Sequence, residues 1–278
     1  MTLEGRRIAL ATPMYNNMCV GDYVESVIGL QAALWAEGAT MGLIRLGATS
    51  DVAMARNLSA ALFLQTDCTD LLFVDADMGF DPLDLIRMLR CGRDVIGAIC
   101  PGKGFDWKRL TAMAARNPAI APAQLEASAP RFGTFRVLAK DACGGIPLDR
   151  EFPVAGIGSA IMAIKRSVFG ALREAFPKRR IAIAGNHKLA PLFAPGTPDM
   201  GTPFEHRFAG GEAMGEDMAF CADWRSLGGE VFACPWFTVR HVGNYAFTSN
   251  LRAIAAGGGV IEISAESPPT IAPGAHPA

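Results

Sequence analysis

The chain has 278 residues, half of them hydrophobic, with a formal net charge of −1 and seven cysteines. This length allows one large domain or two small ones, and the near-neutral charge argues against a general grip on polyanions. The cysteines form no C-x-x-C pair, so a disulfide or zinc framework is not indicated. No run reaches the roughly 18 apolar residues of a membrane span, and no secretory signal is apparent, so we expect a cytoplasmic protein.

Strand and helix signals alternate through the first half of the chain. Apolar runs predict strands at 7–12, 40–46, 71–74 and 94–100, and helical spacing predicts helices at 21–37, 51–65 and 82–91. Gly38 stands where a helix typically ends, Ser50 or Asp51 can cap the next helix, and Pro82 suits a first helical turn. These short connections favour an α/β fold with a mostly parallel sheet and right-handed crossovers.

The pattern weakens beyond residue 102. We expect helices at 106–116, 167–176 and 215–227, and strands at 131–138, 153–165, 229–234 and 237–241. Residues 117–130 are rich in Pro and Ala and are predicted to be a loop. Residues 179–211 are polar with no clear period, and a loop of that length is usually functional or mobile. The tail 265–278 is expected to be disordered.

Two carboxylates, Asp75 and Asp77, directly follow the apolar run Leu71–Val74. Burying an unpaired carboxylate is costly, so both are expected at the carboxyl end of the strand, facing a cation or a ligand. In open α/β sheets that edge is where ligands bind. The small Ala76 permits the turn that would let both aspartates share a ligand. The alternative is a polar strand end, with Asp77 or Asp81 capping the next helix.

Basic and polar side chains are predicted at the same edge. Arg56 and Asn57 lie near the start of the preceding helix, where Arg would suit a phosphate or a base carbonyl and Asn a donor–acceptor edge. The alternative is an exposed Arg and a solvated Asn. Lys103, flanked by glycines after a strand, could meet a phosphate, although the Walker pattern is absent. The G-I-G-S-A run at 156–160 lacks a dinucleotide fingerprint and suggests tight backbone packing.

Two further candidates lie in the last third of the chain. Glu216 and Asp217 open a predicted helix, where acids are favoured by the helix dipole and by capping, or where one of them could act as a general base. His241 ends a predicted strand and is either structural or close enough to the two aspartates to complete an O,O,N set suited to Mn²⁺.

In chain order, the motifs are A-T-P (11–13), A-R-N (55–57), L-L-F-V-D-A-D (71–77), V-A-G-I-G-S-A-I-M-A-I-K-R (154–166), G-E-D-M-A-F-C-x-x-W (215–224) and V-R-H-V-G (239–243). This series resembles the nucleotide-sugar glycosyltransferases of the GT-A fold. It is most similar to bacterial and phage members that share the R-N…D-x-D arrangement with the fungal mannan-polymerase-type mannosyltransferases. The resemblance covers residues 7–247, and stretches 104–150 and 179–211 have no counterpart.

The resemblance implies a GT-A, Rossmann-like sheet flanked by helices in a single domain, 1–264, with a small acceptor-side subregion. Residues 1–103 would form the nucleotide-binding half and residues 104–264 the acceptor-side half. The implied activity is that of a hexosyltransferase whose donor is a nucleoside-diphosphate sugar, with a UDP-sugar favoured. Mn²⁺, or Mg²⁺ in its place, would neutralise the diphosphate leaving group.

The resemblance also implies roles for residues. The donor would be held by Thr12, Pro13, Tyr15, Arg56, Asn57, Asp75, Ala76 and Lys103. The metal ligands would be Asp75, Asp77 and His241. Pro13 and Tyr15 would line the nucleobase pocket. Asp217, with Glu216 beside it, would take the acceptor's proton in an inverting enzyme, whereas retaining members of this fold have no agreed nucleophile.

Two other functions stay open. A nucleotidyltransferase of similar fold would carry a G-x-G-T-R-type signature after the first strand, where this chain reads T-P-M-Y-N-N-M. A non-catalytic nucleotide-sugar-binding protein would keep the fold without the reaction. The acceptor could be a glycan, a lipid-linked sugar, a protein or a modified nucleobase, and we expect residues 179–211 to select it. The sequence indicates no oligomeric state.

Overall fold

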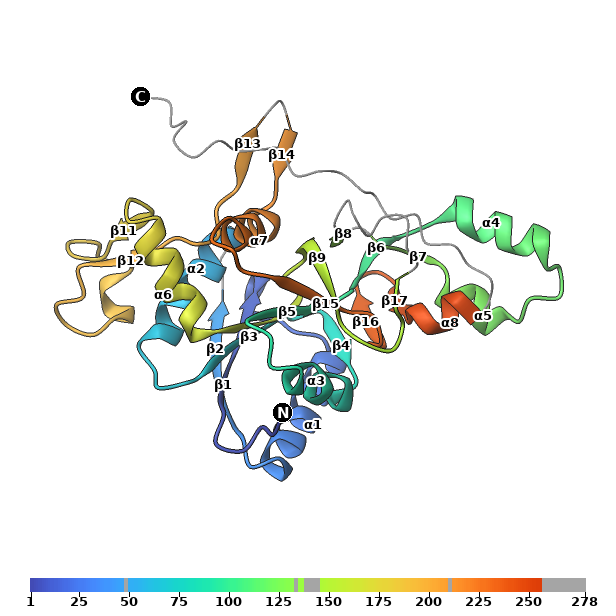
Figure 1. Ribbon diagram of the computed structural model, residues 1–278, viewed down its shortest axis with the longest axis horizontal. Helices are drawn as coiled ribbons and strands as arrows, with labels where there is room; N and C mark the ends of the chain where they lie inside the picture. The colour runs from blue at the N-terminus through green and yellow to red at the C-terminus, as the bar shows by residue number, and fades with distance from the viewer. Residues whose placement is uncertain (48–49, 133–134, 138–145, 210–211, 257–278) are drawn as a thin grey trace.

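The structure, a computed structural model, describes residues 1–47, 50–132, 135–137, 146–209 and 212–256. Its centre is an eight-stranded sheet with helices on both faces (Figure 1). In spatial order the strands are β2 (Thr40–Gly47), β1 (Arg7–Met14), β3 (Asp70–Val74), β10 (Ile161–Lys165), β5 (Val95–Ala98), β15 (Val231–Cys234), β9 (Phe152–Ile157) and β8 (Phe135–Val137). The predicted α/β class is confirmed.

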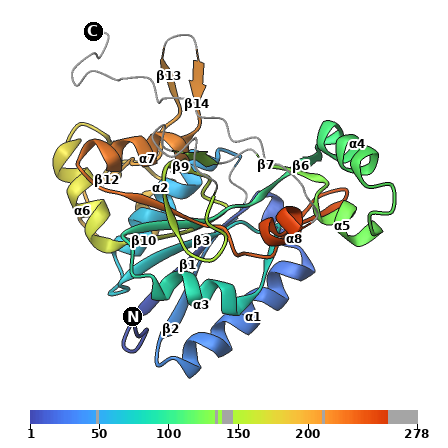
Figure 2. The same ribbon diagram turned by 45° about the vertical axis from the view of Figure 1, so that its right-hand side comes forward.

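Both faces of the sheet are buried beneath helices (Figure 2). The helices are α1 (Gly21–Ala36) and α3 (Pro82–Arg90) on one face, and α2 (Val52–Leu64), α6 (Arg166–Ala175) and α7 (Glu216–Ser226) on the other. Strand β3 supplies Leu72 and Val74 to the first core and Leu71 and Phe73 to the second. A strand buried on both faces reads as a continuous apolar run, which explains why the sequence identifies β3 so clearly.

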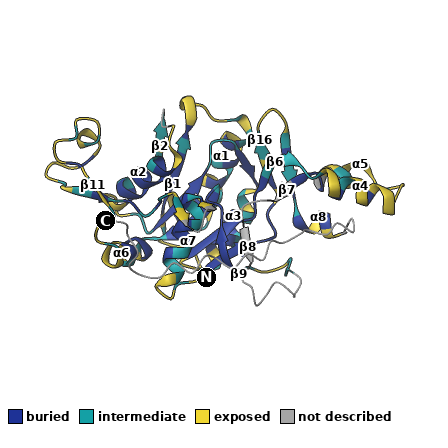
Figure 3. Ribbon diagram, turned by 90° about the horizontal axis from the view of Figure 1, so that it is seen from above, coloured by how far each residue is buried: buried dark blue, intermediate teal, exposed yellow. Residues whose placement is uncertain are grey.

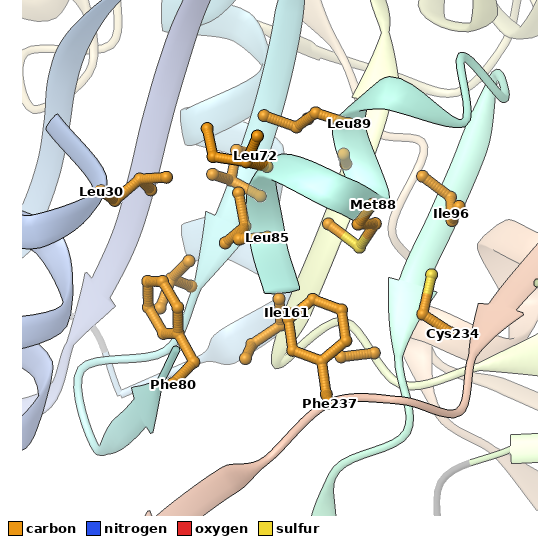
Figure 4. Packing of buried hydrophobic residues seen from close by; sticks show 14 of the residues in the cluster. Leu30, Leu72, Phe80, Leu85, Met88, Leu89, Ile96, Ile161, Cys234 and Phe237 are labelled. Carbon is orange, nitrogen blue, oxygen red and sulfur yellow. The ribbon is translucent and has the colours of Figure 1, made fainter. Parts of the chain in front are cut away.

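The core beneath α1 and α3 is closely packed (Figure 4). Its members include Leu30, Leu72, Phe80, Leu85, Met88, Leu89, Ile96, Ile161, Cys234 and Phe237. Figure 3 shows burial concentrated in the central sheet and the helix faces against it, whereas α4 and α5 are largely exposed. The sheet is therefore the rigid element from which a site at its edge is built.

Local signals set the helix ends as expected. The Asp51 carboxylate accepts the amides of Ala53 (2.9 Å) and Met54 (3.3 Å) at the start of α2. Asp81 caps α3 in the same way, with Pro82 at the first helical position. Gly38 follows α1 with a φ of +73°, a left-handed conformation that glycine adopts without steric cost.

The largest difference from the prediction concerns residues 153–165. The expected single strand is two strands, β9 and β10, which lie apart in the sheet. Strand β10 lies between β3 and β5 and is antiparallel to both, and β9 is antiparallel to β15. The sheet is thus mixed, with β9 and β10 opposed to the other strands. An apolar strand has the same composition in either direction, so the sequence pattern carries no information on this point.

Smaller elements surround the sheet, and several were not predicted. They include η1 (Tyr15–Asn17), β4 (Met78–Phe80), β6 (Pro101–Phe105), α5 (Pro122–Ala127), β7 (Pro130–Phe132), β17 (Ala246–Ser249) and α8 (Leu251–Ala256). The expected elements at 106–116 and 237–241 are α4 (Trp107–Arg116) and β16 (Val239–Val242). The predicted loop at 117–130 is wrong over α5, and the strand expected at 131–138 is split between β7 and β8.

The stretch 179–211 is partly ordered into short elements. These are β11 (Arg180–Ala182), η3 (Ala190–Leu192), β12 (Asp199–Gly201) and β13 (Arg207–Ala209), which pairs with β14 (Glu212–Met214) in a projecting hairpin (Figure 2). Ile183, Phe193 and Met200 pack against Leu58 and Ala61 of α2. The expected disordered tail lies outside the described residues. No helix of the described chain combines the length and apolar character needed to cross a membrane.

Candidate active site

Three separate segments hold the backbone of the D-A-D triplet, Asp75–Asp77, at the carboxyl end of β3. The Asp75 amide donates to the carbonyl oxygen of Ala160 (2.9 Å). The Ala76 carbonyl oxygen accepts the amide of Val20 (3.0 Å), and the Asp77 carbonyl oxygen accepts the amide of Val242 (2.8 Å). The Met78 amide closes the expected turn by donating back to the first carbonyl (3.1 Å). The two carboxylates are therefore positioned by the fold itself.

Asp75 is paired with Arg56, whose side chain is only 3% exposed. The Arg56 Nη2 donates to both carboxylate oxygens (3.0 and 3.2 Å), and its Nε donates to Glu216 Oε1 (3.4 Å). Its Nη1 is buried and has no hydrogen-bond partner among the described residues. Burial raises the pKa of Asp75, against the opposing effect of the Arg56 guanidinium. Arg56 thus lies behind the carboxylates and joins β3 to α7, whereas the resemblance implied direct contact with the donor.

Asp77 lies between two other basic side chains. Lys103 Nζ donates to Asp77 Oδ2 (2.5 Å), and His241 Nε2 lies 3.5 Å from the same oxygen. Burial alone would raise the pKa of Asp77, but hydrogen bonds from His241 and Lys103 outweigh it and lower this pKa to about 2. β6 carries the lysine and β16 the histidine, so elements from both halves of the chain meet at this carboxylate.

The donor set around Asp77 fits a divalent cation in part. His241 Nδ1 lies 2.7 Å from the carbonyl oxygen of Pro101, which can only accept, so Nδ1 donates to it and Nε2 is the nitrogen that faces Asp77. Metal-binding histidines are commonly oriented by such a bond. Asp75, the third expected ligand, is turned to Arg56, and within the described ranges no three His, Cys, Asp or Glu side chains converge on one point.

The start of α7 brings a second acidic pair to the same region. Glu216 is 10% exposed and contacts Arg56, and His206 Nδ1 lies 3.9 Å from its Oε2. Asp217 Oδ1 accepts the amide of Met218 (2.7 Å). Burial, followed by the negative charge of Glu216, raises the pKa of Asp217, which suits a group that must accept a proton near neutral pH.

A cleft of about 460 Å³ opens beside the D-A-D triplet. It is lined by Pro13, Tyr15, Met18, Cys19, Val20, Ser50, Val52, Ala55, Asp75, Ala76 and Asp77. Four of the residues expected to hold the donor therefore line one cleft: Pro13, Tyr15, Asp75 and Ala76. Lys103 is not in the lining but donates to Asp77, which is. Tyr15 is 70% exposed, so much of its side chain is accessible to solvent.

Asn57 and Thr12, like Arg56, do not line the cleft. Asn57 is 4% exposed, and its amide group exchanges two hydrogen bonds with the backbone of Phe204 (2.8 and 2.9 Å). It therefore anchors the stretch 179–209 to α2. Thr12 is fully buried, and its hydroxyl is bonded to the Tyr23 hydroxyl (2.6 Å). Both polar groups are satisfied inside the protein, which leaves neither available to a ligand in this arrangement.

Other site residues had no usable signal in the sequence. Val20 and Val242 contribute backbone amides, which no side-chain motif reveals. The wall formed by Met18 and Cys19 comes from an irregular segment before α1. His206, 51% exposed beside Glu216, is one of two histidines in the polar stretch 179–211, and only its place shortly before G-E-D hinted at a role.

No family model matches this chain, and no match was found among curated proteins. Among solved structures it is similar to A197 from STIV, with a TM-score of 0.43 and 15% identity, covering 88% of this chain and 94% of that one. TarS 1–349 from S. aureus gives a TM-score of 0.36 at 11% identity, covering 88% and 60%. A mannose-1-phosphate geranyltransferase from Thermus thermophilus gives 0.34 at 14% identity, covering 63% and 61%. The function proposed below therefore rests on the site.

Proposed function

We propose that the protein is a metal-dependent glycosyltransferase of GT-A type that uses a nucleoside-diphosphate sugar, with a UDP-sugar favoured. The observation that carries the proposal is the convergence of Lys103 and His241 on Asp77, which lines the cleft. An ammonium group, a histidine ring oriented by its bond to Pro101 and a strongly acidic carboxylate suit a diphosphate and its cation.

In this proposal, separate residues bind the cation and the phosphate groups of the donor. Asp77 and His241 would hold Mn²⁺ or Mg²⁺, with Asp75 turning from Arg56 to join them or to contact the ribose. When bound, the ion neutralises charge on the diphosphate leaving group. Lys103 would then leave Asp77 and donate to a phosphate oxygen.

The acceptor side would be served by α7. In the inverting mode, the bond from the anomeric carbon to the diphosphate oxygen breaks while the acceptor oxygen bonds to that carbon. Asp217 takes the acceptor's proton, and its raised pKa favours this transfer near neutral pH. Glu216 contributes by raising that pKa and by holding Arg56.

The test is thermal unfolding with UDP or GDP, with and without Mn²⁺, on the wild type, Asp77→Ala and the control Asp94→Ala. Asp94 also pairs with a lysine (Lys165, 2.8 Å) but precedes β5, at the opposite edge of the sheet. A ligand at 100 times its Kd stabilises a protein by about 2.7 kcal/mol. We expect a Mn²⁺-dependent shift with one nucleotide that Asp77→Ala abolishes and Asp94→Ala keeps.

Absence of any nucleotide- or metal-dependent shift in the wild type would overturn the proposal. If the wild type does show the shift, hydrolysis of the donor sugar nucleotide separates an enzyme from a non-catalytic nucleotide-sugar-binding protein. Release of inorganic pyrophosphate from a nucleoside triphosphate would instead indicate the nucleotidyltransferase alternative.

A further inference from the structure

Four aromatic side chains form a cluster that the donor site does not use. Phe105 has its ring centroid 5.1 Å from Trp107, 5.2 Å from Tyr245 and 5.0 Å from Phe247. Phe247 is 6% exposed and forms the floor, whereas Trp107 is 63% exposed and Tyr245 is 41% exposed. We call this group the aromatic platform. Keeping two large rings in water is unfavourable, so such a patch indicates a binding surface.

The platform begins where the donor site ends. Lys103 and Phe105 both belong to β6, two residues apart, in the part of the strand where its register with β7 shifts. Phe247 is the cross-strand partner of His241 in the β16–β17 pair. The side chains that meet Asp77 thus continue directly into the platform, and β6, β16 and β17 lie together beside the central sheet (Figure 1).

Polar groups lie at the rim of the platform. The Tyr245 hydroxyl donates to Glu126 Oε1 (3.0 Å), and Glu126 is exposed on α5. A flat apolar surface with hydroxyl and carboxylate groups at its edge matches a sugar ring, which has a C–H face and hydroxyls around its edge. The Glu126 carboxylate would repel the phosphates of a nucleic acid strand, which disfavours a stacked base.

We propose that the aromatic platform binds a sugar ring of a glycan acceptor, next to the ring that receives the transferred sugar. This rests on the proposed function, because the site at Asp77 would deliver the donor sugar to one end of the platform. It names the acceptor class as a glycan, and it assigns the recognition of that glycan to residues 105–107 and 245–247 as well as to the stretch 179–211.

The experiment measures the binding of neutral tetrasaccharides by saturation-transfer NMR, with Kd from titration. The probes are maltotetraose, cellotetraose, mannotetraose and chitotetraose. The variants are Trp107→Leu, Trp107→Phe and Tyr245→Leu, with Trp35→Leu as the control, because Trp35 is 78% exposed on α1 and has no part in the platform. The Mn²⁺-dependent shift with UDP is measured on every variant.

We expect at least one tetrasaccharide to bind the wild type and the Trp35 variant equally. Loss of one stacked ring should weaken its binding roughly two- to twelve-fold in Trp107→Leu and Tyr245→Leu. Trp107→Phe should keep most of the affinity because it keeps a flat ring, and the signal should be strongest on ring C–H protons. All variants should keep the shift with UDP, since none removes a group of the donor site.

Two results would overturn the inference. One is that no tetrasaccharide binds a wild type that does respond to UDP, and the other is equal binding by Trp107→Leu and Trp35→Leu. Binding of a thymidine decanucleotide, abolished by Trp107→Leu, would show that the platform takes bases in place of sugars. A wild type that binds a tetrasaccharide through Trp107 but shows no shift with UDP or GDP would contradict the proposed donor chemistry and leave the platform in place.

Discussion

Replacing Arg56 with Met tests whether the buried guanidinium organises the carboxylates of the site. The side chain is 3% exposed and joins Asp75 of β3 to Glu216 of α7. It also lies over the ring of Phe73, 5.0 Å from its centroid. Methionine fills much of the same volume but removes the charge, so two carboxylates lose their shared cationic partner.

The expected cost is large because one partner of a buried ionic network is removed. Breaking such a network costs about 3 to 5 kcal/mol of unfolding free energy. For a chain of this size that corresponds to a fall in Tm of roughly 6 to 20 °C. Because Arg56 lowers the pKa of Asp75 against burial, its removal lets that pKa rise further. The loss should therefore be larger at pH 7 than at lower pH, and it should shrink as falling pH protonates Asp75.

The assay is urea unfolding at pH 7 and at lower pH, with Arg93→Met as the matched control. Arg93 also pairs with a carboxylate, Glu151 (2.9 Å), and also lies over a ring, that of Phe232 (3.9 Å), but its side chain is 41% exposed. Exposed pairs contribute about 0 to 1 kcal/mol. If Arg56→Met loses no more stability than Arg93→Met, the organising role assigned to Arg56 is refuted.

Three other substitutions test separate parts of the structure. Asn57→Ala leaves the buried backbone groups of Phe204 unpaired, so we expect a loss of about 2 to 4 kcal/mol and faster proteolysis within 179–209; unchanged proteolysis would contradict the anchoring role. Asp217→Asn should raise Tm at pH 7, because folding raises the pKa of Asp217 and the wild type therefore loses stability as pH rises from the unfolded-state pKa to the folded-state pKa. The gain in Tm should vanish below about pH 4, and a gain that persists there would refute ionisation of Asp217 as its cause. Gly97→Ala would place a Cβ 2.9 Å from the Ile161 carbonyl oxygen and should cost about 1 to 3 kcal/mol in chemical unfolding, whereas a neutral result would mean that β5 and β10 adjust freely.

Much of the first half of the fold could be predicted because its signals are local. Asp51 and Asp81 cap helices through amides two or three residues away, and Gly38 ends a helix by its own backbone freedom. Pro122 begins α5, and its position as a first helical residue was an available signal inside a stretch that composition marked as a loop. The direction and place of β10 depend on pairing with distant strands, which the period of a sequence does not encode.

In the candidate site, too, residues with a local sequence signal could be predicted, whereas residues that depend on distant partners could not. Asp75 and Asp77 follow a strongly marked strand, and its carboxyl end is where α/β sheets bind ligands, so their place could be anticipated. The partner of Asn57 lies 147 residues away, and no local pattern separates an amide that binds a ligand from one that binds a remote backbone. Arg56 was expected to contact the donor. Its burial could not be foreseen from the local sequence, because that burial depends on α7, far along the chain.

The position of β10 has a consequence for synthesis of the chain. Strands β3 and β5 are made within the first hundred residues, yet each is bonded to β10 and neither to the other, and the second edge of β5 pairs only with β15, at residues 231–234. The hydrogen bond from the Asp75 amide to the Ala160 carbonyl oxygen also cannot form until Ala160 has been synthesised. On the ribosome, the nascent chain therefore carries unpaired apolar strand edges at least until residue 165 has emerged, a state prone to capture by chaperones or by another chain. A fragment that ends before Ile161 should consequently fail to bind nucleotide, even though it contains the whole D-A-D motif.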